Sequence, residues 1–364
     1  MEKHIKILFA GGGTGGHLYP AISVAEELQN LYEHCEIAFI GSKDKIEGRV
    51  VPQLGYQFYP IWISGFQRKL TIKNLLFPVK LIASMVKSLI ICMKFKPDIA
   101  IGSGGYVSGP AIWAAKVMGA KIVLLEQNAY PGITTRLLEK YADEIHITFE
   151  EAKNYLRNKE KVFVSGNPVR NSLKLIDKSE ALKKFDLKDK FTVLVVGGSL
   201  GSKTLNEGIL ENLQKLKAMD IQVIWQTGKY YYDIYKSYND ENIKVMDFIN
   251  DMQAAYSSAD IVISRAGASA ICEIANLGLP TILVPSPNVT ANHQYHNAKA
   301  LADKNAAILI EDNEFSNKII EVISNLKDNK KQLELLSNNI KQFGKPEATN
   351  IIAKSILKIL NIII

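Results

Sequence analysis

The sequence lacks acidic residues over one long stretch. Between Gly48 and Asp98 there is no Asp or Glu, whereas eight Lys and Arg residues occur there. The whole chain has 44 Lys and Arg against 37 Asp and Glu, a formal net charge of +7, so the rest of the chain is close to neutral. A nucleic-acid-binding protein spreads its positive charge over several elements. We therefore expect no nucleic-acid partner but a narrower contact with another anionic surface.

Cysteines and long hydrophobic runs are also scarce. The 3 cysteines, Cys35, Cys92 and Cys272, are far apart and form no CxxC pair, which predicts neither a disulfide framework nor a zinc cluster and favours a reducing compartment. No run reaches the roughly 18 apolar residues of a membrane-spanning helix, and the first ten residues are too short for a secretory signal. We expect a soluble protein that can touch a membrane surface.

The composition is that of a globular protein, with 47% hydrophobic and 22% charged residues. The 364 residues suggest two domains of roughly 150 to 200 residues each. Apolar, β-rich runs alternate with helical patterns along the whole chain, which predicts a parallel α/β architecture. The predicted strands are residues 5–10, 36–40, 99–102, 122–125, 144–147, 162–165, 191–196, 222–226, 261–264, 281–284 and 307–310.

The two halves of the chain begin in the same way. Residues 6–17 (KILFAGGGTGGH) and 192–204 (TVLVVGGSLGSKT) both read as a strand, a glycine-rich turn and a helix. This repeat predicts two Rossmann-like domains that face each other across a cleft. We expect an N-terminal domain at residues 1–165, a C-terminal domain at 166–345, and a last helix within 346–364 that packs back on the N-terminal domain.

The first glycine-rich loop has the pattern of a phosphate-binding turn. Gly11, Gly13 and Gly16 fit GxGxxG, in which glycines let backbone N–H groups and a helix N-terminus approach a phosphate. A nicotinamide-dependent enzyme also needs an acidic residue after the second strand, but residues 36–40 run into Gly41-Ser42-Lys43. This absence weakens the interpretation as a nicotinamide-dependent enzyme. If the loop served only as a tight turn, it would need fewer glycines than it has.

Two more glycine clusters follow predicted strands. Residues 197–204 nearly match the P-loop of NTPases, but Ser202 replaces its second glycine and no strand ends in a convincing acid for Mg²⁺, so an NTPase is a weak alternative. Residues 102–110 form the third cluster. Three such loops at strand ends predict a cleft for an anionic, phosphorylated ligand.

Patterns for binding a metal ion are sparse. The chain contains no Asp-x-Asp pair, the carboxylate clamp of many nucleotide-sugar enzymes, and His293 and His296 have no third ligand nearby in sequence. We expect neither a metal site nor a cofactor. Helix dipoles and arginine would then have to stabilise a diphosphate leaving group.

Six short motifs occur in order along the chain. They are residues 11–17 (GGGTGGH), 104–110 (GGYVSGP), 126–128 (EQN), 166–170 (GNPVR), 197–201 (GGSLG) and 273–280 (EIANLGLP). Together they resemble the MurG family, the bacterial peptidoglycan N-acetylglucosaminyltransferases of the two-domain GT-B class. The resemblance extends over about residues 5–300 and is far more specific than any single motif.

The resemblance implies a defined reaction. N-acetylglucosamine would move from UDP-N-acetylglucosamine to the muramyl C4 hydroxyl of lipid I, undecaprenyl-pyrophosphoryl-MurNAc-pentapeptide, giving lipid II with inversion at the anomeric carbon. The N-terminal domain would hold the acceptor and face the membrane, and the C-terminal domain would hold the donor. The family also implies a peripheral protein at the cytoplasmic face of the bacterial plasma membrane, associated with other proteins of cell-wall synthesis and serving cell shape and division.

The resemblance also implies donor-binding residues. Ser199 and Arg170 would contact the diphosphate, Ile249 the uracil through its backbone, Glu273 both ribose hydroxyls, and Gln294 the transferred sugar. A carboxylate such as Glu273 offers the pair of acceptors that a vicinal diol needs, and an arginine donates in bidentate fashion. Contacts near Gln294 transfer less securely, because the preceding residues depart from the family pattern. Further implied donor-binding positions are Thr14, Gly15, Gly16, Asn128 and Ala268.

Catalysis needs a base on the acceptor side to take the proton of the attacking hydroxyl. His17 follows the first glycine loop, and imidazole titrates in the right pH range. Glu126 is a second candidate, which could orient or replace His17. The family commonly has a histidine before this glutamate, where the present chain has Leu125. The implied acceptor or phosphate loops contain Gly13, Gly104, Gly105 and Tyr106.

The acid-free stretch predicts a basic amphipathic helix. Lys73, Lys80, Lys87 and Lys94 are seven residues apart and would form one stripe, with apolar residues between them. Such a helix can lie on an anionic bilayer, with Phe66 and Phe77 as apolar anchors. A helix that covers a sheet and turns its lysines to water is the alternative interpretation.

Two other functions fit part of the pattern. A different GT-B transferase could move a UDP-sugar to another lipid or small molecule. A UDP-sugar-binding regulatory protein would need the pocket of Arg170, Ser199 and Glu273 but not His17. Transfer of labelled sugar to a lipid I analogue, compared with other UDP-sugars, separates these possibilities.

Overall fold

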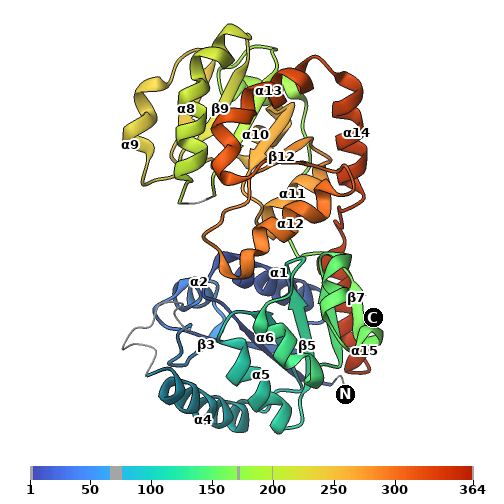
Figure 1. Ribbon diagram of the computed structural model, residues 1–364. Helices are drawn as coiled ribbons and strands as arrows, with labels where there is room; N and C mark the ends of the chain where they lie inside the picture. Colours follow the sequence, from blue (N-terminus) through green and yellow to red (C-terminus); the bar gives the residue numbers. More distant parts are fainter. Residues whose placement is uncertain (1–2, 66–75, 170–172, 199, 363–364) are drawn as a thin grey trace. The chain divides into compact units, whose positions relative to one another are not determined.

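The computed structural model describes residues 3–65, 76–169, 173–198 and 200–362. The chain forms two compact units, one of Met1–Arg170 together with Pro346–Ile364 and the other of Asn171–Lys345. Each unit is built on one parallel β-sheet with helices packed against it (Figure 1). This arrangement confirms the predicted α/β class with two Rossmann-like domains.

The first unit contains a seven-stranded sheet in the order β3-β2-β1-β4-β5-β6-β7. Its strands are apolar and mostly buried because a parallel sheet is covered on both faces. They are β1 (Ile5–Gly11), β2 (Cys35–Gly41), β3 (Gln57–Pro60), β4 (Ile99–Gly104), β5 (Lys121–Glu126), β6 (Glu144–Ile147) and β7 (Val162–Val164). Strand order reverses between β1 and β4, where Gly11 pairs with Gly104. Ligands bind outside the carboxyl ends of strands at such a switch point.

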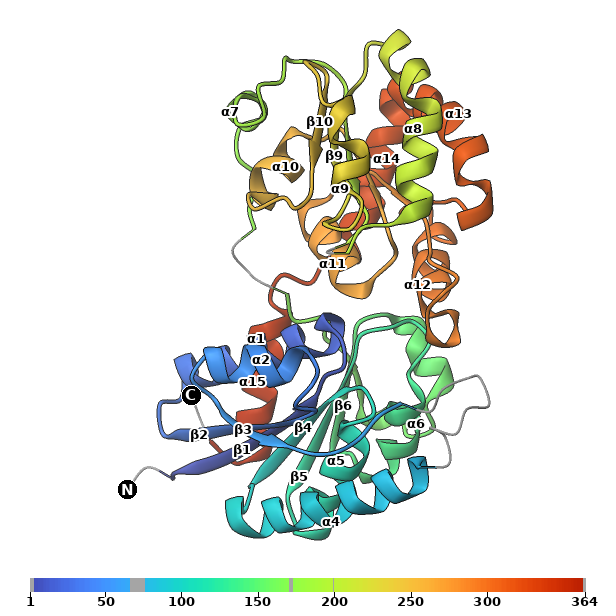
Figure 2. The same cartoon turned by 90° about the vertical axis from the view of Figure 1, so that its left-hand side faces the viewer.

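Helices cover both faces of the first sheet, as Figure 2 shows. On one face, α1 (Gly15–Leu31), α2 (Ile46–Gln53) and α15 (Ala348–Ile359) enclose a core around Phe9. On the other face, α4 (Phe77–Phe95), α5 (Ser108–Val117) and α6 (Ile133–Leu138) enclose a core around Leu8. Three short 3₁₀ segments complete the unit: η1 (Glu139–Tyr141), η2 (Glu150–Tyr155) and η3 (Lys159–Lys161).

The second unit contains a six-stranded parallel sheet in the order β10-β9-β8-β11-β12-β13. The strands are β8 (Thr192–Val196), β9 (Gln222–Gln226), β10 (Ile243–Met246), β11 (Ile261–Ser264), β12 (Thr281–Leu283) and β13 (Ile308–Leu309). Strand order reverses beside β8, which pairs with both β9 and β11. The glycine loop after β8 therefore also lies at a switch point.

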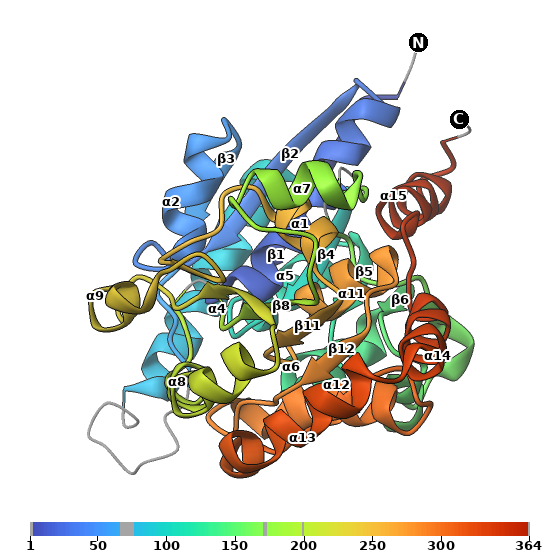
Figure 3. The same cartoon turned by 90° about the horizontal axis from the view of Figure 1, so that it is seen from above.

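The helices of the second unit pack on this sheet and on each other (Figure 3). One core, centred on Trp225, includes α8, α9, α13 and α14. Elsewhere α10 packs against β8 and α7, α11 against α14, and α12 against β13. The bounds are α7 (Lys178–Lys183), α8 (Lys203–Ala218), α9 (Tyr232–Tyr235), α10 (Met252–Ser258), α11 (Ala268–Leu277), α12 (His293–Ala302), α13 (Phe315–Lys327) and α14 (Lys330–Lys341), with 3₁₀ segments η4 (Lys236–Tyr238), η5 (Thr290–Asn292) and η6 (Asp312–Glu314).

The last helix, α15, belongs to the first unit. It packs against α1 and buries Ile352 and Ile356 completely. A polar network adds to this contact: Ser355 donates to Glu144, whose Oε2 lies 3.1 Å from Nε2 of the buried His146. The Nδ1 of that imidazole lies 2.7 Å from Ser165 Oγ, just beyond β7. Hydrogen bonds through Glu144 and His146 thus link Ser165, just after β7, to the C-terminal helix α15.

Two strands, β3 and β10, were not predicted from the sequence. Each has four residues and lies at the edge of its sheet. None of the four residues of β3 is fully buried, and buried and half-buried residues alternate in β10. Edge strands that are only partly covered lack the continuous apolar run that marked the other strands.

Candidate active site

A buried carboxylate holds the first glycine loop. Glu47, at the start of α2, is 1% exposed and accepts backbone N–H groups of Gly13, at 2.9 Å, and Ser42, at 3.0 Å. A Cβ on Gly12 would lie 2.3 Å from the Glu47 carboxyl carbon, so a larger residue there would displace this carboxylate from its hydrogen bonds. The loop then leads into α1, whose N-cap Thr14 makes no side-chain capping bond and whose first turn carries no acid. Gly15 and Gly16 begin this helix, which can therefore present its N-terminal donors to an anion.

His17 lies beside the third glycine cluster. Its Nδ1 is 3.0 Å from Oε1 of the buried Gln127, which follows β5. A Cβ on Gly104 would come within 2.6 Å of the same nitrogen, and one on Gly105 within 2.5 Å of the Gly12 carbonyl oxygen. Both glycines also have positive φ, at 105° and 81°. The first and third glycine loops thus pack directly on each other, with the imidazole between them.

The Glu126 side chain is engaged in shaping the loop after β5. It is 4% exposed, and its two oxygens accept from Asn128 N at 3.0 Å, Gly132 N at 2.9 Å and Thr135 Oγ1 at 2.6 Å, with Asn128 Nδ2 at 3.3 Å. An ionised carboxylate has about four acceptor sites, and all four are occupied here. The preceding Leu125 is in the core against α1. The structure thus makes Glu126 an anchor of its loop.

Ser108 and Tyr106, at the third glycine cluster, make close contacts with neighbouring segments. Ser108 Oγ accepts from Gly104 N, at 3.2 Å, and lies 2.6 Å from the Ala10 carbonyl oxygen, so it joins β4 to β1. Tyr106 is 41% exposed, and its ring lies so close to Gly65 that a Cβ there would be 2.3 Å from Cε2. A phenol on the surface next to two glycine loops can contact a ligand bound by them.

In the second unit, the glycine loop after β8 packs on the end of β9. A Cβ on Gly201 would lie 2.0 Å from the Thr227 carbonyl oxygen, and one on Gly228 2.2 Å from Gly201 N. Asn206 on α8 fixes this contact, because its Nδ2 donates to the Thr227 carbonyl at 2.9 Å and its Oδ1 accepts from Trp225 Nε1. The loop is thereby held against β9 immediately before the start of α8.

Arg265, which the sequence analysis missed, joins this loop to the ends of β11 and β12. Its guanidinium donates to Ser202 Oγ through Nε, at 3.0 Å, and Nη2, at 2.6 Å, and to the Val284 carbonyl. It also pairs with Asp312. Ser202 in turn caps α8 by accepting from Leu205 N. The only sequence signal for this arginine is its position directly after a predicted buried strand.

Helix α11 carries two expected donor-binding residues, Ala268 and Glu273, and Glu273 contacts a buried phenol. Ala268 is the first helical residue, after Gly267, and Tyr256 on α10 donates through its hydroxyl to Glu273 Oε2 at 3.2 Å. Burial, followed by the nearby Glu273 carboxylate, raises the pKa of Tyr256 well above its ordinary value, so the phenol stays a donor. Ile249, between β10 and α10, is buried to 1% exposure. These positions all lie at the carboxyl edge of the sheet or on the helices that follow it.

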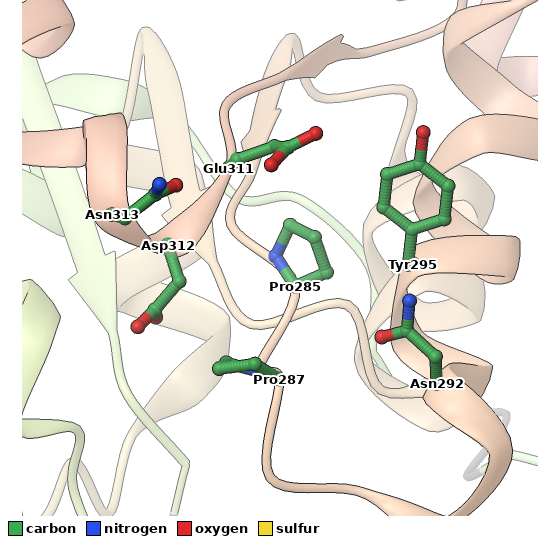
Figure 4. A pocket seen from close by; sticks show the side chains of 7 residues that line it. All are labelled: Pro285, Pro287, Asn292, Tyr295, Glu311, Asp312 and Asn313. Carbon is green, nitrogen blue, oxygen red and sulfur yellow. The ribbon is translucent and has the colours of Figure 1, made fainter.

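An open pocket of about 440 Å³ in the second unit is lined by the loop after β12, by η5 and α12, and by the segment of η6 (Figure 4). Its lining combines amide, carboxylate and phenol side chains with two prolines, and the Glu311 carboxylate points across Pro285 toward Tyr295. Gln294 Oε1 accepts Ser286 N at 2.8 Å, which ties α12 to the loop after β12. Carboxylate, amide and phenol groups around a pocket suit a ligand rich in hydroxyl groups. The full lining is Pro285, Pro287, Asn292, Tyr295, Glu311, Asp312 and Asn313.

Helix α4 presents a mixed apolar and basic surface. Val79, Ile82, Val86, Ile90 and Met93 follow helical spacing and are between 39% and 63% exposed. Lys87 and Lys94 are exposed beside them, and Lys80 lies over the exposed Trp62 ring, with Nζ 5.3 Å from its centroid. Phe77, the first residue of the helix, is half-buried. In the part of the chain that the structure describes, none of the helices is long and apolar enough to span a bilayer.

Four of the expected site residues lie outside the described residues: Phe66, Lys73, Arg170 and Ser199. His293 Nδ1 lies 2.9 Å from the Thr290 carbonyl oxygen. Among residues 3–65, 76–169, 173–198 and 200–362, no group of three or more His, Cys, Asp or Glu is placed to hold a metal ion.

Comparison with known protein families and solved structures identifies both halves of the chain as glycosyltransferase domains. Residues 7–147 match the glycosyltransferase family 28 N-terminal domain, and residues 192–352 match its C-terminal domain. A crystal structure of Acinetobacter baumannii MurG superposes with a TM-score of 0.79 at 30% identity, covering 98% of this chain and 100% of that one. The UDP-GlcNAc 2-epimerase of Neisseria meningitidis, bound to UDP-GlcNAc, has a TM-score of 0.65 at 16% identity, which shows the fold alone.

Curated relatives match over nearly their whole length. The UDP-N-acetylglucosamine–N-acetylmuramyl-(pentapeptide) pyrophosphoryl-undecaprenol N-acetylglucosamine transferase of Flavobacterium psychrophilum is 43% identical, covering 99% of this chain and 98% of its own. The enzyme of that name from Bacteroides thetaiotaomicron is 41% identical, with 99% of both chains covered. The fold and its glycine loops define a two-domain glycosyltransferase of GT-B architecture. The chain belongs to glycosyltransferase family 28 and, within it, to the MurG family.

Proposed function

We propose that this protein transfers N-acetylglucosamine from UDP-N-acetylglucosamine to the muramyl C4 hydroxyl of lipid I, with inversion, to give lipid II. The observation that carries the proposal is the position of His17 between the first and third glycine loops. A binding protein would need the loops, whereas an acyl or glycosyl transfer also needs a base near the bound ligand. The names of relatives at 43% and 41% identity support the same substrates.

The acceptor side is the first unit. Its two glycine loops can hold the pyrophosphate of lipid I through backbone N–H groups. The contacts of Thr14, Gly15, Gly16 and Asn128 with the donor, which the family resemblance implies, are kept as part of this proposal. Tyr106, exposed next to these loops, then contacts the same ligand. Glu126 and Asn128 shape the neighbouring loop, and His17 takes the proton of the attacking hydroxyl.

The donor side is the second unit. Glu273, held by Tyr256, accepts hydrogen bonds from the ribose diol, and Ala268 at the start of α11 lies along the nucleotide. The backbone of Ile249 meets the uracil. The polar pocket next to Gln294 receives the sugar, and the loop that contains Ser199, together with Arg170, meets the diphosphate.

The leaving UDP carries two phosphates whose charge must be stabilised. The N-terminus of α8 and the glycine loop before it supply dipoles and N–H donors for this purpose. Arg265, which is paired with Asp312, holds Ser202, the N-cap of α8, in place. In this proposal these groups stabilise the departing diphosphate without a metal ion.

We propose that the exposed apolar residues of α4 rest on the cytoplasmic leaflet of the plasma membrane. Its exposed Val79, Ile82 and Val86 can enter the interface, while Lys87 and Lys94 meet anionic headgroups. The acceptor carries a lipid tail that stays in the membrane, so the first unit must approach that surface. This contact explains why the positive charge of the chain is concentrated in one segment.

The experiment that tests the proposal is incubation with labelled UDP-N-acetylglucosamine and a lipid I analogue, alongside UDP-glucose and an undecaprenyl phosphate acceptor. We expect transfer only with the first pair. Transfer to the other lipid would favour a different lipid glycosyltransferase, and donor binding without any transfer would favour a regulatory protein. Either outcome would reject the proposal.

A further inference from the structure

The side chain of Gln127 contacts the imidazole of His17. The Gln127 side chain is buried, at 3% exposure, and its two polar ends make different contacts. Nε2 donates to the carbonyl oxygen of Leu125, at 3.3 Å, and Oε1 lies 3.0 Å from His17 Nδ1. Both partners come from elements that the fold fixes, β5 and α1.

These two contacts determine which way the amide points. A backbone carbonyl can only accept a hydrogen bond, so the end of the amide near Leu125 must be the NH₂ group. The reverse orientation would set the amide oxygen against the carbonyl oxygen inside the protein, with neither able to donate. The end that faces the imidazole is therefore the oxygen.

The amide oxygen in turn determines the tautomer of the ring. Because Oε1 can only accept, Nδ1 of His17 must carry a proton, and in the neutral imidazole Nε2 then has the lone pair. Gly104 leaves the space that the ring needs, since a Cβ there would be 2.6 Å from Nδ1. The carboxylates of the adjoining elements face other groups: Glu47 on α2 accepts from Gly13 and Ser42, and Glu126 at the end of β5 accepts from Gly132 and Thr135.

We propose that Gln127 is the positioning residue of this reaction, holding His17 in the tautomer whose Nε2 accepts the proton of the acceptor hydroxyl. The inference rests on the proposed function and extends it. As the hydroxyl oxygen bonds to the anomeric carbon, its proton passes to Nε2 and the bond to UDP breaks, with the electron pair leaving on the diphosphate. The imidazolium keeps its Nδ1–H···Oε1 bond and later gives the proton to solvent.

The test combines a spectrum of the resting protein with kinetics of its variants. In ¹⁵N-histidine-labelled protein without substrate, the His17 signals, assigned by their loss in His17→Ala, should show protonated Nδ1 and unprotonated Nε2 at high pH. Gln127→Leu should shift these signals toward the other tautomer and lower kcat by about tenfold to a hundredfold, no more than the lower end of the 10²–10⁴ that a general base contributes, because the base itself is retained. Gln127→Glu places a carboxylate beside the ring, which favours imidazolium, and should move the acidic limb of the kcat profile up by about one pH unit or more.

Gln29 supplies the matched control. It lies on α1, the helix of His17, and accepts a hydrogen bond from Tyr56 at the surface. Gln29→Leu and Gln29→Glu should leave the His17 signals and the pH profile unchanged. The proposal is overturned if wild-type His17 carries its proton on Nε2, or if both Gln127 variants keep the wild-type tautomer and pH profile. The spectrum needs no turnover, so a protein without transferase activity that shows the expected tautomer would count against the function and not against the role of Gln127.

Discussion

Three buried polar side chains fix the backbone around His17. Glu47 holds the first glycine loop, Ser108 joins the third loop to β1, and Glu126 holds the loop after β5. Each acts on main-chain N–H or C=O groups, so the glycine loops have a defined shape before a ligand arrives. A preformed set of donors costs less ordering when the ligand binds, which favours both affinity and catalysis.

On the donor side, the corresponding contact is between Tyr256 and Glu273. We predict that Tyr256→Phe raises KM for UDP-N-acetylglucosamine about fivefold, since the lost hydrogen bond contributes about 1 kcal/mol, and changes kcat little. Steady-state kinetics with varied donor measure this. Tyr235→Phe, at a buried tyrosine whose ring lies tilted against Trp225 in the same unit, is the control. A Tyr256→Phe enzyme with wild-type donor KM would contradict the role of this pair.

The site residues that could be predicted from the sequence are those that lie in short contiguous motifs. The glycine loops and His17 are contiguous in sequence, so their chemistry was visible as a motif. Gln127 and Arg265 were not predicted to act in the site, because their partners His17 and Ser202 are 110 and 63 residues away. Glu126 was a candidate base, and only the four hydrogen bonds to its carboxylate indicate an anchoring role. Such contacts are set by the fold, and an isolated sequence does not contain them.

Helix α4 combines two faces with different partners. Ile91, Cys92 and Phe95 are buried in the core, and burial raises the pKa of Cys92 to about 11, so this thiol is unreactive at neutral pH. The opposite face exposes the apolar residues Val79, Ile82, Val86, Ile90 and Met93, together with Lys87 and Lys94. The two interpretations of the sequence, a sheet-covering helix and a membrane-facing one, are therefore compatible in one element.

We predict that Lys87→Glu with Lys94→Glu lowers binding to vesicles containing anionic lipid by at least about tenfold, since each basic residue near such a surface contributes about 1 kcal/mol. Lys80 is left intact because it also contacts Ser64 and Trp62. Vesicle sedimentation at low and physiological salt measures the effect. Lys203→Glu with Lys236→Glu, on the second unit, makes the same change in net charge and should bind normally. Equal loss in both pairs would show that net charge alone, and not α4, directs binding.

The predicted strands are mostly short, largely apolar runs, and they include the half-exposed edge strands β7 and β13. β1, β4 and β8 show continuous apolar runs that end in glycine loops, so both their type and their ends were visible. β3 and β10 lie at sheet edges, where half-exposed residues break the pattern. The prediction therefore captured the centre of each sheet, which carries the site, and missed one edge of each.

At the scale of the whole molecule, the first unit is built from both ends of the chain. Ile352, Ala353, Ile356 and Leu357 of α15 are fully buried in the same core as β1. Glu144 links this helix to His146 and thus to Ser165. Burial disfavours the charged form of Glu144, but hydrogen bonds from His146 and Ser355 outweigh it and hold the pKa of this carboxyl below its ordinary value.

A lowered pKa means that Glu144 stabilises the fold when ionised. Its contribution is complete above the ordinary pKa of a glutamate, about 4.3, and is lost as the pH falls through the lower folded value. We predict that Glu144→Gln lowers the free energy of unfolding by about 1–3 kcal/mol at pH 7, and that the difference from wild type shrinks below about pH 4. Denaturant titrations at both pH values measure it, with Glu150→Gln at an exposed position as control. A constant difference at all pH values would refute the role of the charge.

The most direct test of the whole account is the structure of the product made from UDP-N-acetylglucosamine and a lipid I analogue. Mass spectrometry should show the acceptor heavier by one N-acetylhexosamine, and NMR should place the new β-linkage at the muramyl C4 oxygen. His17→Ala should form this product at least about a hundredfold more slowly, the lower end of what a general base contributes. An unchanged acceptor after prolonged incubation with active donor, or a sugar joined at another position, would contradict the account.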